Sequence, residues 1–101
     1  MARKTVDNLE LERWRVLHAA TLLEQLCIHA KQDPDFKPRL SQSTTRWYCN
    51  VDGAEFELLC CGPKFYDTRA GRGGGGAVDL AMHLCGLDFA SAVCLLRTKR
   101  L

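Results

Sequence analysis

Two β-prone runs joined by Asp52 and Gly53 are the feature that most constrains the fold of this chain. The first run, residues 46–51, is RWYCNV, and the second, residues 55–61, is EFELLCC. Aromatic residues favour extended backbone, and an Asp-Gly pair between two such runs is typical of a tight hairpin turn. A shorter run at residues 64–67 is expected to add a third strand. The sequence therefore predicts a small, three-stranded antiparallel sheet.

A helical part is expected before this sheet. Within residues 9–30, apolar residues recur mostly every three to five positions, with charged residues between them, which favours amphipathic helix. A break near residues 16–20 is one alternative, because Thr21 can cap a second helix. The two prolines of residues 33–38 end the helical part, and an exposed loop is expected over 38–45.

Two short helices are expected after the sheet. Residues 77–84 carry a broad apolar face, and Gly86 stands where a helix C-cap would lie. Asp88 is a good N-cap for a last helix through residue 96, and Asp79 is expected to accept hydrogen bonds from backbone N–H groups. This order of elements predicts an α+β fold, with residues 1–101 forming a single domain.

Composition excludes several classes of protein. With 101 residues, 47% apolar and 26% charged, the chain has enough apolar residues for one core, and disorder is not expected. No apolar run is long enough to cross a bilayer, and residues 1–7 lack the apolar stretch of a secretory signal. We therefore expect a cytoplasmic protein.

The net charge of +2 does not by itself indicate a nucleic-acid-binding protein. The charge is unevenly distributed, however. Residues 1–60 hold eight Lys and Arg against nine Asp and Glu, whereas residues 61–101 hold six against three. The C-terminal part is thus mildly basic, which favours a polyanionic partner only weakly.

Six cysteines are many for a chain of this length; they are Cys27, Cys49, Cys60, Cys61, Cys85 and Cys94. Disulfides are not expected in reducing cytosol. Structural zinc sites use ligand pairs such as C-x-x-C, and no pair of cysteines here has that spacing. We expect free thiols that pack as small apolar side chains, with no cofactor and with Zn²⁺ as the less favoured alternative.

Two sets of residues have the chemistry of a binding site. Four glycines, Gly73, Gly74, Gly75 and Gly76, lead into a predicted helix, and such a junction can hold a phosphate through free backbone amides, with Arg69 and Arg72 next to it. The alternative is a flexible connector. The second set is Arg46, Trp47, Lys64 and Tyr66, aromatic and basic residues on or beside the predicted strands, which suit stacking with unpaired bases. Here too an alternative stands, that Trp47 and Phe65 belong to the core.

No catalytic set is found. His18, His29 and His83 are scattered over predicted helices, and no cysteine lies in a nucleophile motif. We therefore expect no enzymatic activity, with a thiol or zinc enzyme as the least favoured alternative.

Residues 64–84 and 86–93 together resemble a known family. The shared pattern is a strand, a glycine-rich turn, a helix of the form G-x-x-D-L-x-M, and then G-x-D-F-x-x-A-V. It is similar to the N-terminal zinc-ribbon domain of bacterial and phage DNA primases, and closest to the degenerate copies in plasmid and mobile-element proteins. The resemblance covers residues 46–96, and the segment 19–28 resembles the helix that precedes the module. In that family, two Cys/His pairs hold zinc; their counterparts are absent here, so zinc binding is not implied.

The resemblance implies a non-catalytic module that binds single-stranded DNA, with RNA as the alternative ligand, and acts as an accessory unit in replication or priming of a plasmid or mobile element. The implied contacts are the strand and turn residues Arg46, Trp47, Lys64, Tyr66, Arg69 and Arg72, together with Gly73–Gly76. A primase, polymerase or helicase is a further expected partner. The alternative is a protein-interaction adaptor, suggested by Trp14 and Leu9 on the first helix.

Overall fold

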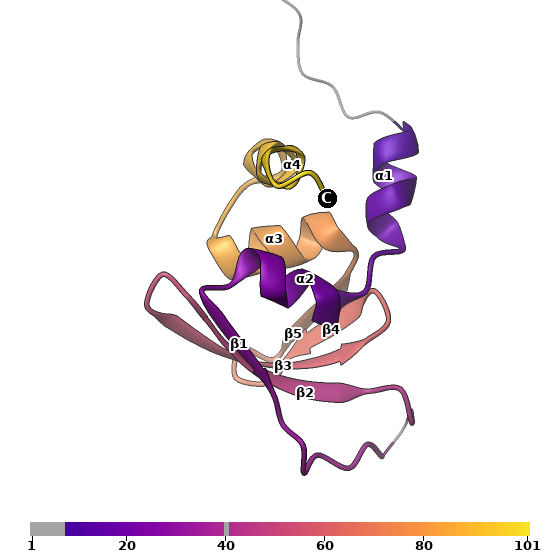
Figure 1. Ribbon diagram of the computed structural model, residues 1–101, viewed down its shortest axis with the longest axis vertical. Helices are drawn as coiled ribbons and strands as arrows, with labels where there is room; N and C mark the ends of the chain where they lie inside the picture. The colour runs from indigo at the N-terminus through magenta and orange to yellow at the C-terminus, as the bar shows by residue number, and fades with distance from the viewer. Residues whose placement is uncertain (1–7, 40) are drawn as a thin grey trace, which may run out of the picture.

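The computed structural model describes residues 8–39 and 41–101, and it has an α+β fold (Figure 1). In chain order the elements are α1 (Asn8–Arg15), α2 (Ala19–Leu26), β1 (His29–Gln32), β2 (Thr45–Val51), β3 (Ala54–Cys61), β4 (Lys64–Asp67), β5 (Arg72–Gly75), α3 (Ala77–Cys85) and α4 (Phe89–Thr98). Residues 1–7, on which the expectation about a secretory signal depends, lie outside the described residues.

The five strands form one antiparallel sheet in the order β1-β2-β3-β4-β5, so each strand pairs with its neighbours in the chain. The predicted hairpin is confirmed: Val51 pairs with Ala54, and Asp52 and Gly53 both have positive φ, at 50° and 87°. This combination belongs to the tight turn whose twist matches that of the flanking strands. The strand predicted at 64–67 is also confirmed as β4.

The sheet has five strands rather than the three expected. β1 begins at His29, so the helix predicted over residues 9–30 is wrong for its last two residues, and the strand pairs with β2 through His29–Asn50 and Ala30–Cys49. β5 contains three glycines, which have no strand preference of their own, and it forms by pairing with β4. Both additional strands thus form because they pair with a neighbouring strand, and the local sequence pattern does not show this pairing.

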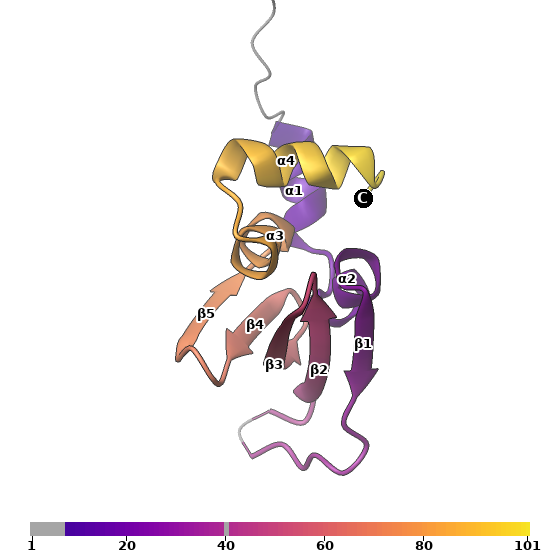
Figure 2. The same ribbon diagram turned by 90° about the vertical axis from the view of Figure 1, so that its left-hand side faces the viewer.

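The helices lie on one side of the sheet (Figures 1 and 2). α2 and α3 pack on the sheet, whereas α4 lies beyond α3, with α1 beside both. One cluster of buried residues joins these layers: Trp14, Ala19, Leu22, Leu23, Leu26, Cys49, Leu58, Cys60, Phe65, Ala77, Leu80, Ala81, Leu84, Ala92, Val93 and Leu96. The N-terminal helical part therefore shares its core with the segment 46–96.

Most of the predicted helix ends are confirmed, and the predicted cap at Thr21 is wrong. The break after α1 is confirmed, but Thr21 is not a cap: α2 begins at Ala19, whose N–H donates to the carbonyl of Gly62 at 2.8 Å. Gly86 is the C-cap of α3 with a left-handed φ of 63°, and the carboxylate of Asp88 accepts a hydrogen bond from the N–H of Ser91 at 2.8 Å. Both of these caps are as predicted.

In the described ranges, no single helix is both long and apolar enough to span a membrane; α3 and α4 reach the required length only together, with a bend of 106° between them.

Candidate nucleic-acid interface

In the part of the chain that the structure describes, one face of the sheet carries no helix (Figure 2). Side chains alternate along each strand, so the residues next to the buried ones point to this side. We call it the open face. Its strand residues are His29, Lys31, Arg46, Tyr48, Asn50, Glu55, Glu57, Leu59, Cys61, Lys64, Tyr66, Gly73 and Gly75.

Two tyrosines are the main aromatic groups of the open face. Tyr48 is 39% exposed and Tyr66 is 46% exposed. Tyr66 pairs with Gly73, where a Cβ would come within 3.0 Å of the Tyr66 ring atom Cδ1. The absence of a side chain at Gly73 therefore leaves room for the ring. Tyr66 was expected from the sequence, whereas Tyr48 was missed, although the alternation in residues 46–51 places it opposite to Trp47.

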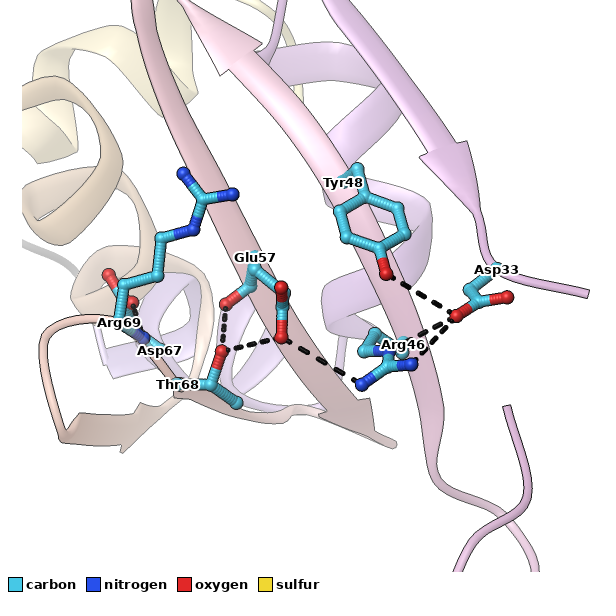
Figure 3. A network of polar contacts seen from close by, with 7 residues as sticks. All are labelled: Asp33, Arg46, Tyr48, Glu57, Asp67, Thr68 and Arg69. Carbon is cyan, nitrogen blue, oxygen red and sulfur yellow. Dashed lines mark hydrogen bonds and ion pairs between the residues drawn. The ribbon is translucent and has the colours of Figure 1, made fainter. Parts of the chain in front are cut away.

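Arg46 is engaged by carboxylates on the open face (Figure 3). Its Nε and Nη2 atoms lie 3.1 and 3.0 Å from Oδ2 of Asp33, and Nη1 lies 3.8 Å from Oε2 of Glu57. The guanidinium also stacks over the ring of Phe36, at 5.1 Å from its centroid. The hydrogen bond to Asp33 raises the pKa of Arg46. Two carboxylates thus neutralise Arg46, which makes it a weaker phosphate ligand than the sequence indicated.

Three other cations of this side have no carboxylate partner in the described part of the chain: Lys31, Lys64 and Arg69. All three are exposed. Arg69 lies in the turn between β4 and β5, and its side chain extends beside β3 on the same side as Glu57 and Tyr48 (Figure 3). These cations flank the tyrosines and are available to an external anion.

Asp67, on the helix side of the sheet, holds the turn that carries Arg69 in place. One oxygen of this buried carboxylate accepts hydrogen bonds from the N–H groups of Arg69 and Ala70, each at 3.0 Å. The other oxygen lies 2.7 Å from Nε2 of His83 on α3. Thr68 fixes the turn from the other side by donating to the Glu57 carboxylate at 2.9 Å. The backbone of Arg69 is therefore positioned by both the helix layer and the sheet.

Trp47 and Arg72 do not lie on the open face. Trp47 pairs with the fully buried Leu58, packs against the core and donates through Nε1 to Thr45 Oγ1 at 2.9 Å. Arg72 pairs with Asp67 and lines a cavity of about 370 Å³ that also contains His83 on the helix side. Phe65 is buried as well. For Trp47 and Phe65, the core alternative is confirmed.

The glycine run is not a free phosphate loop. The N–H of Gly75 donates to Oδ2 of Asp79 at 3.2 Å, as predicted for Asp79, and the N–H of Gly76 donates to the carbonyl of Pro63 at 3.1 Å. Gly76 is buried, and at Gly74 a Cβ would meet Oδ2 of Asp79 at 3.0 Å and the Phe65 ring at 3.1 Å. The amides of Gly75 and Gly76, just before α3, are thus already occupied, and the glycines allow close packing of β5.

The Asp67–His83 pair was missed by sequence reasoning. His83 is half-buried, with its ring centroid 5.8 Å from that of Phe56 and 5.6 Å from that of Phe65. Burial acts to raise the pKa of Asp67, but the hydrogen bonds from Ala70, His83 and Arg69 outweigh it, so the pKa lies below its usual value. The two residues are 16 positions apart, and no local pattern joins them.

All six cysteines are free thiols, and Cys60 and Cys61 lie on opposite faces of the sheet. Cys94 is exposed, in contrast to the packing role predicted for it. Burial raises the pKa of Cys60 to about 12, and a hydrogen bond with Cys49 lowers the pKa of Cys27. Among the described residues, no three His, Cys, Asp or Glu side chains are grouped so that they can hold a metal ion.

Comparison with known proteins finds a relative that is much longer than this chain. The chain is 54% identical over 99 residues to a protein of Zymomonas mobilis subsp. mobilis described as "65 kDa protein". The match covers 98% of this chain but only 14% of that protein, so the chain corresponds to a small part of a much longer relative. No model of a known protein family matches the chain, and no solved structure matches it.

Proposed function

We propose that the open face binds single-stranded nucleic acid, with single-stranded DNA as the preferred ligand, and that the chain is a non-catalytic module. The observation that carries this proposal is the arrangement of two exposed tyrosines, Tyr48 and Tyr66, among three cations that have no carboxylate partner within residues 8–39 and 41–101, namely Lys31, Lys64 and Arg69. Unpaired bases stack on aromatic rings, and cations contact the phosphates between them.

The difference between the two faces of the sheet also supports the open face as the binding surface. The helix side of the sheet is filled by the core, whereas the open face combines exposed rings with polar groups. A double helix does not present its base faces to a flat sheet, but an unpaired strand can lay its bases on one. The sheet therefore suits a single strand better than a duplex.

The biological setting follows from the resemblance of residues 46–96 to primase zinc-ribbon domains. We place the module in replication or priming of a plasmid or mobile element, as an accessory unit that contacts the template. A primase, polymerase or helicase is the corresponding protein partner, acting in the cytoplasm. The much greater length of the Zymomonas protein is compatible with a module joined to other domains.

Removal of the two cations beside Tyr48 tests this function. The variant Lys31→Gln/Arg69→Gln is expected to bind single-stranded DNA about tenfold more weakly, with a shallower dependence on salt, because about two phosphate contacts are lost. Fluorescence anisotropy with labelled single- and double-stranded DNA and RNA, at two salt concentrations, measures this effect.

The matched control is Lys99→Gln/Arg100→Gln, which removes the same charge from the end of α4 on the helix side. Its affinity is expected to change little. Equal losses in the two double variants, or tighter binding of duplex than of single strands, would contradict a specific role for the open face.

A second candidate function is a protein-interaction adaptor. Trp14 no longer supports this function, because it is only 1% exposed and belongs to the core. Leu9 and Phe89, however, are 72% and 48% exposed on α1 and α4, away from the open face. A protein partner retained in a pull-down after nuclease treatment, by a chain that binds no oligonucleotide, would favour this function over the first.

A further inference from the structure

A hollow of about 360 Å³ lies at one end of the open face, next to Tyr48. Its lining includes groups from three strands and the β4–β5 turn, among them Lys31, Asn50, Glu55 and Arg69. This volume falls within the range of sites for small ligands, which begins at about 300 Å³. It is large enough for one nucleobase, and the ring of Tyr48 forms part of its wall.

The cations of the hollow come from opposite sides of it. Lys31 is on β1, at the edge of the sheet, and Arg69 is in the turn beyond β3. In the described ranges neither has a carboxylate partner. Lys31 and Arg69 can therefore contact the phosphates on the two sides of one nucleotide, while its base lies between them against the ring of Tyr48.

The polar groups of the hollow define a hydrogen-bonding pattern. Asn50 and Glu55 are direct cross-strand partners, so their side chains lie next to each other. Oδ1 of Asn50 already accepts a hydrogen bond from the N–H of Gly53 at 3.1 Å, which leaves the amino group of Asn50 as a donor. Glu55 is exposed, and its carboxylate offers two acceptor oxygens. Asn50 and Glu55 thus present one donor beside a pair of acceptors, and His29, the partner of Asn50 on β1, lines the hollow next to them.

Guanine is the base that complements this pattern best. Its Watson–Crick edge has two adjacent donors, N1–H and the N2 amino group, followed by the O6 acceptor. The two donors match the carboxylate of Glu55, and O6 matches the amino group of Asn50. The other three bases each place an acceptor beside their Watson–Crick donor, where it would face the carboxylate oxygens.

We propose that this hollow is a guanine-selective subsite for one unpaired nucleotide, with Glu55 as the residue that determines base preference. The site presupposes the single-strand binding proposed above. Tyr48 stacks on the base, while Lys31 and Arg69 contact the flanking phosphates.

Inosine provides the test, because it differs from guanosine only in lacking the N2 amino group. An oligothymidine with one central guanine is expected to bind the wild-type chain about tenfold more tightly than the same oligonucleotide with inosine, since one arm of a bidentate contact is lost. In Glu55→Gln, which replaces one acceptor oxygen by a donor, the affinity ratio between the two oligonucleotides is expected to fall to near one. Deleting the negative charge of Glu55 is expected to raise the affinity for both oligonucleotides equally, so this general effect cancels in their ratio.

Glu24→Gln, at an exposed position on α2, is the matched control and is expected to keep the wild-type ratio. Equal affinity of the wild-type chain for guanine and inosine, or an unchanged ratio in Glu55→Gln, would overturn the guanine site while leaving single-strand binding intact. If no oligonucleotide binds, the proposed function itself fails, and the guanine site fails with it.

Discussion

At the scale of single residues, the buried carboxylate of Asp67 determines the conformation of the turn beside the proposed binding surface. It is only 3% exposed, yet it accepts two backbone hydrogen bonds and contacts His83. A buried carboxylate is tolerated only when its oxygens are satisfied, and here both are. The same contacts that fix the turn also keep Asp67 ionised.

Replacing Asp67 by Asn is expected to lower the free energy of unfolding by about 1–3 kcal/mol near neutral pH, because the charge-assisted contact with His83 is lost. The folded pKa of Asp67 lies below the unfolded value of about 3.9. Its stabilisation is therefore present above that pH and is lost as the pH falls through the folded pKa.

Urea unfolding of the wild-type chain and Asp67→Asn, at about pH 7 and about pH 3, measures this dependence. The difference between the two proteins is expected to shrink at the acidic pH. A difference that is equally large at both values would show that the charge of Asp67 does not stabilise the fold.

At the scale of elements, β5 shows that a glycine run can be a packing requirement. At Gly73, a Cβ would come within 2.9 Å of the carbonyl oxygen of Phe65, a backbone atom that cannot move aside easily. At Gly75, the nearest atom is Cγ of Lys64 at 3.8 Å, which is an ordinary contact. The glycines of one strand therefore differ in how much they tolerate a side chain.

Gly73→Ala is expected to destabilise the protein by about 1–3 kcal/mol, because the added methyl group forces β5 away from β4. Gly75→Ala is the matched control, with an expected change within about 0.5 kcal/mol or slight stabilisation through the unfolded chain. Thermal unfolding followed by circular dichroism compares the two. Similar melting temperatures for both variants would argue against the steric role of Gly73.

At the scale of the whole molecule, the two ends of the described chain are held together on the side opposite to the open face (Figure 2). Glu10 and Arg97 form an ion pair with Oε1 and Nη2 at 2.6 Å, and Nε1 of Trp14 donates to the carbonyl of Leu101 at 3.0 Å. Because Trp14 is almost completely buried, these contacts join α1 and α4 to one core.

Trp14→Phe is expected to lower the free energy of unfolding by about 1–3 kcal/mol, through the lost hydrogen bond and a small cavity. Affinity for oligonucleotides is expected to stay the same when the protein is folded, because α1 lies away from the open face. Denaturant unfolding and anisotropy titration measure the two effects separately. Val16→Ala, at a 67% exposed position, is the control for stability. A loss of binding in folded Trp14→Phe would place part of the interface among the helices.

The candidate site was only partly predictable from the sequence. Tyr66, Lys64 and Arg69 were identified from their types and their places beside predicted strands, and all three are exposed. Arg46 was identified as well, but its two carboxylate partners were not. Asp33, for example, is 13 residues away and meets Arg46 only because β1 pairs with β2.

What the sequence determined by itself is local: the hairpin at Asp52 and Gly53, the caps at Gly86 and Asp88, and the break after α1. Each depends on the backbone preferences or hydrogen bonds of residues within one turn. The tertiary structure decided which additional strands join the sheet, which face each aromatic and basic residue occupies, and which cations are neutralised. These depend on register and on partners distant in the chain, because a shift of one residue in a strand moves every side chain to the other face.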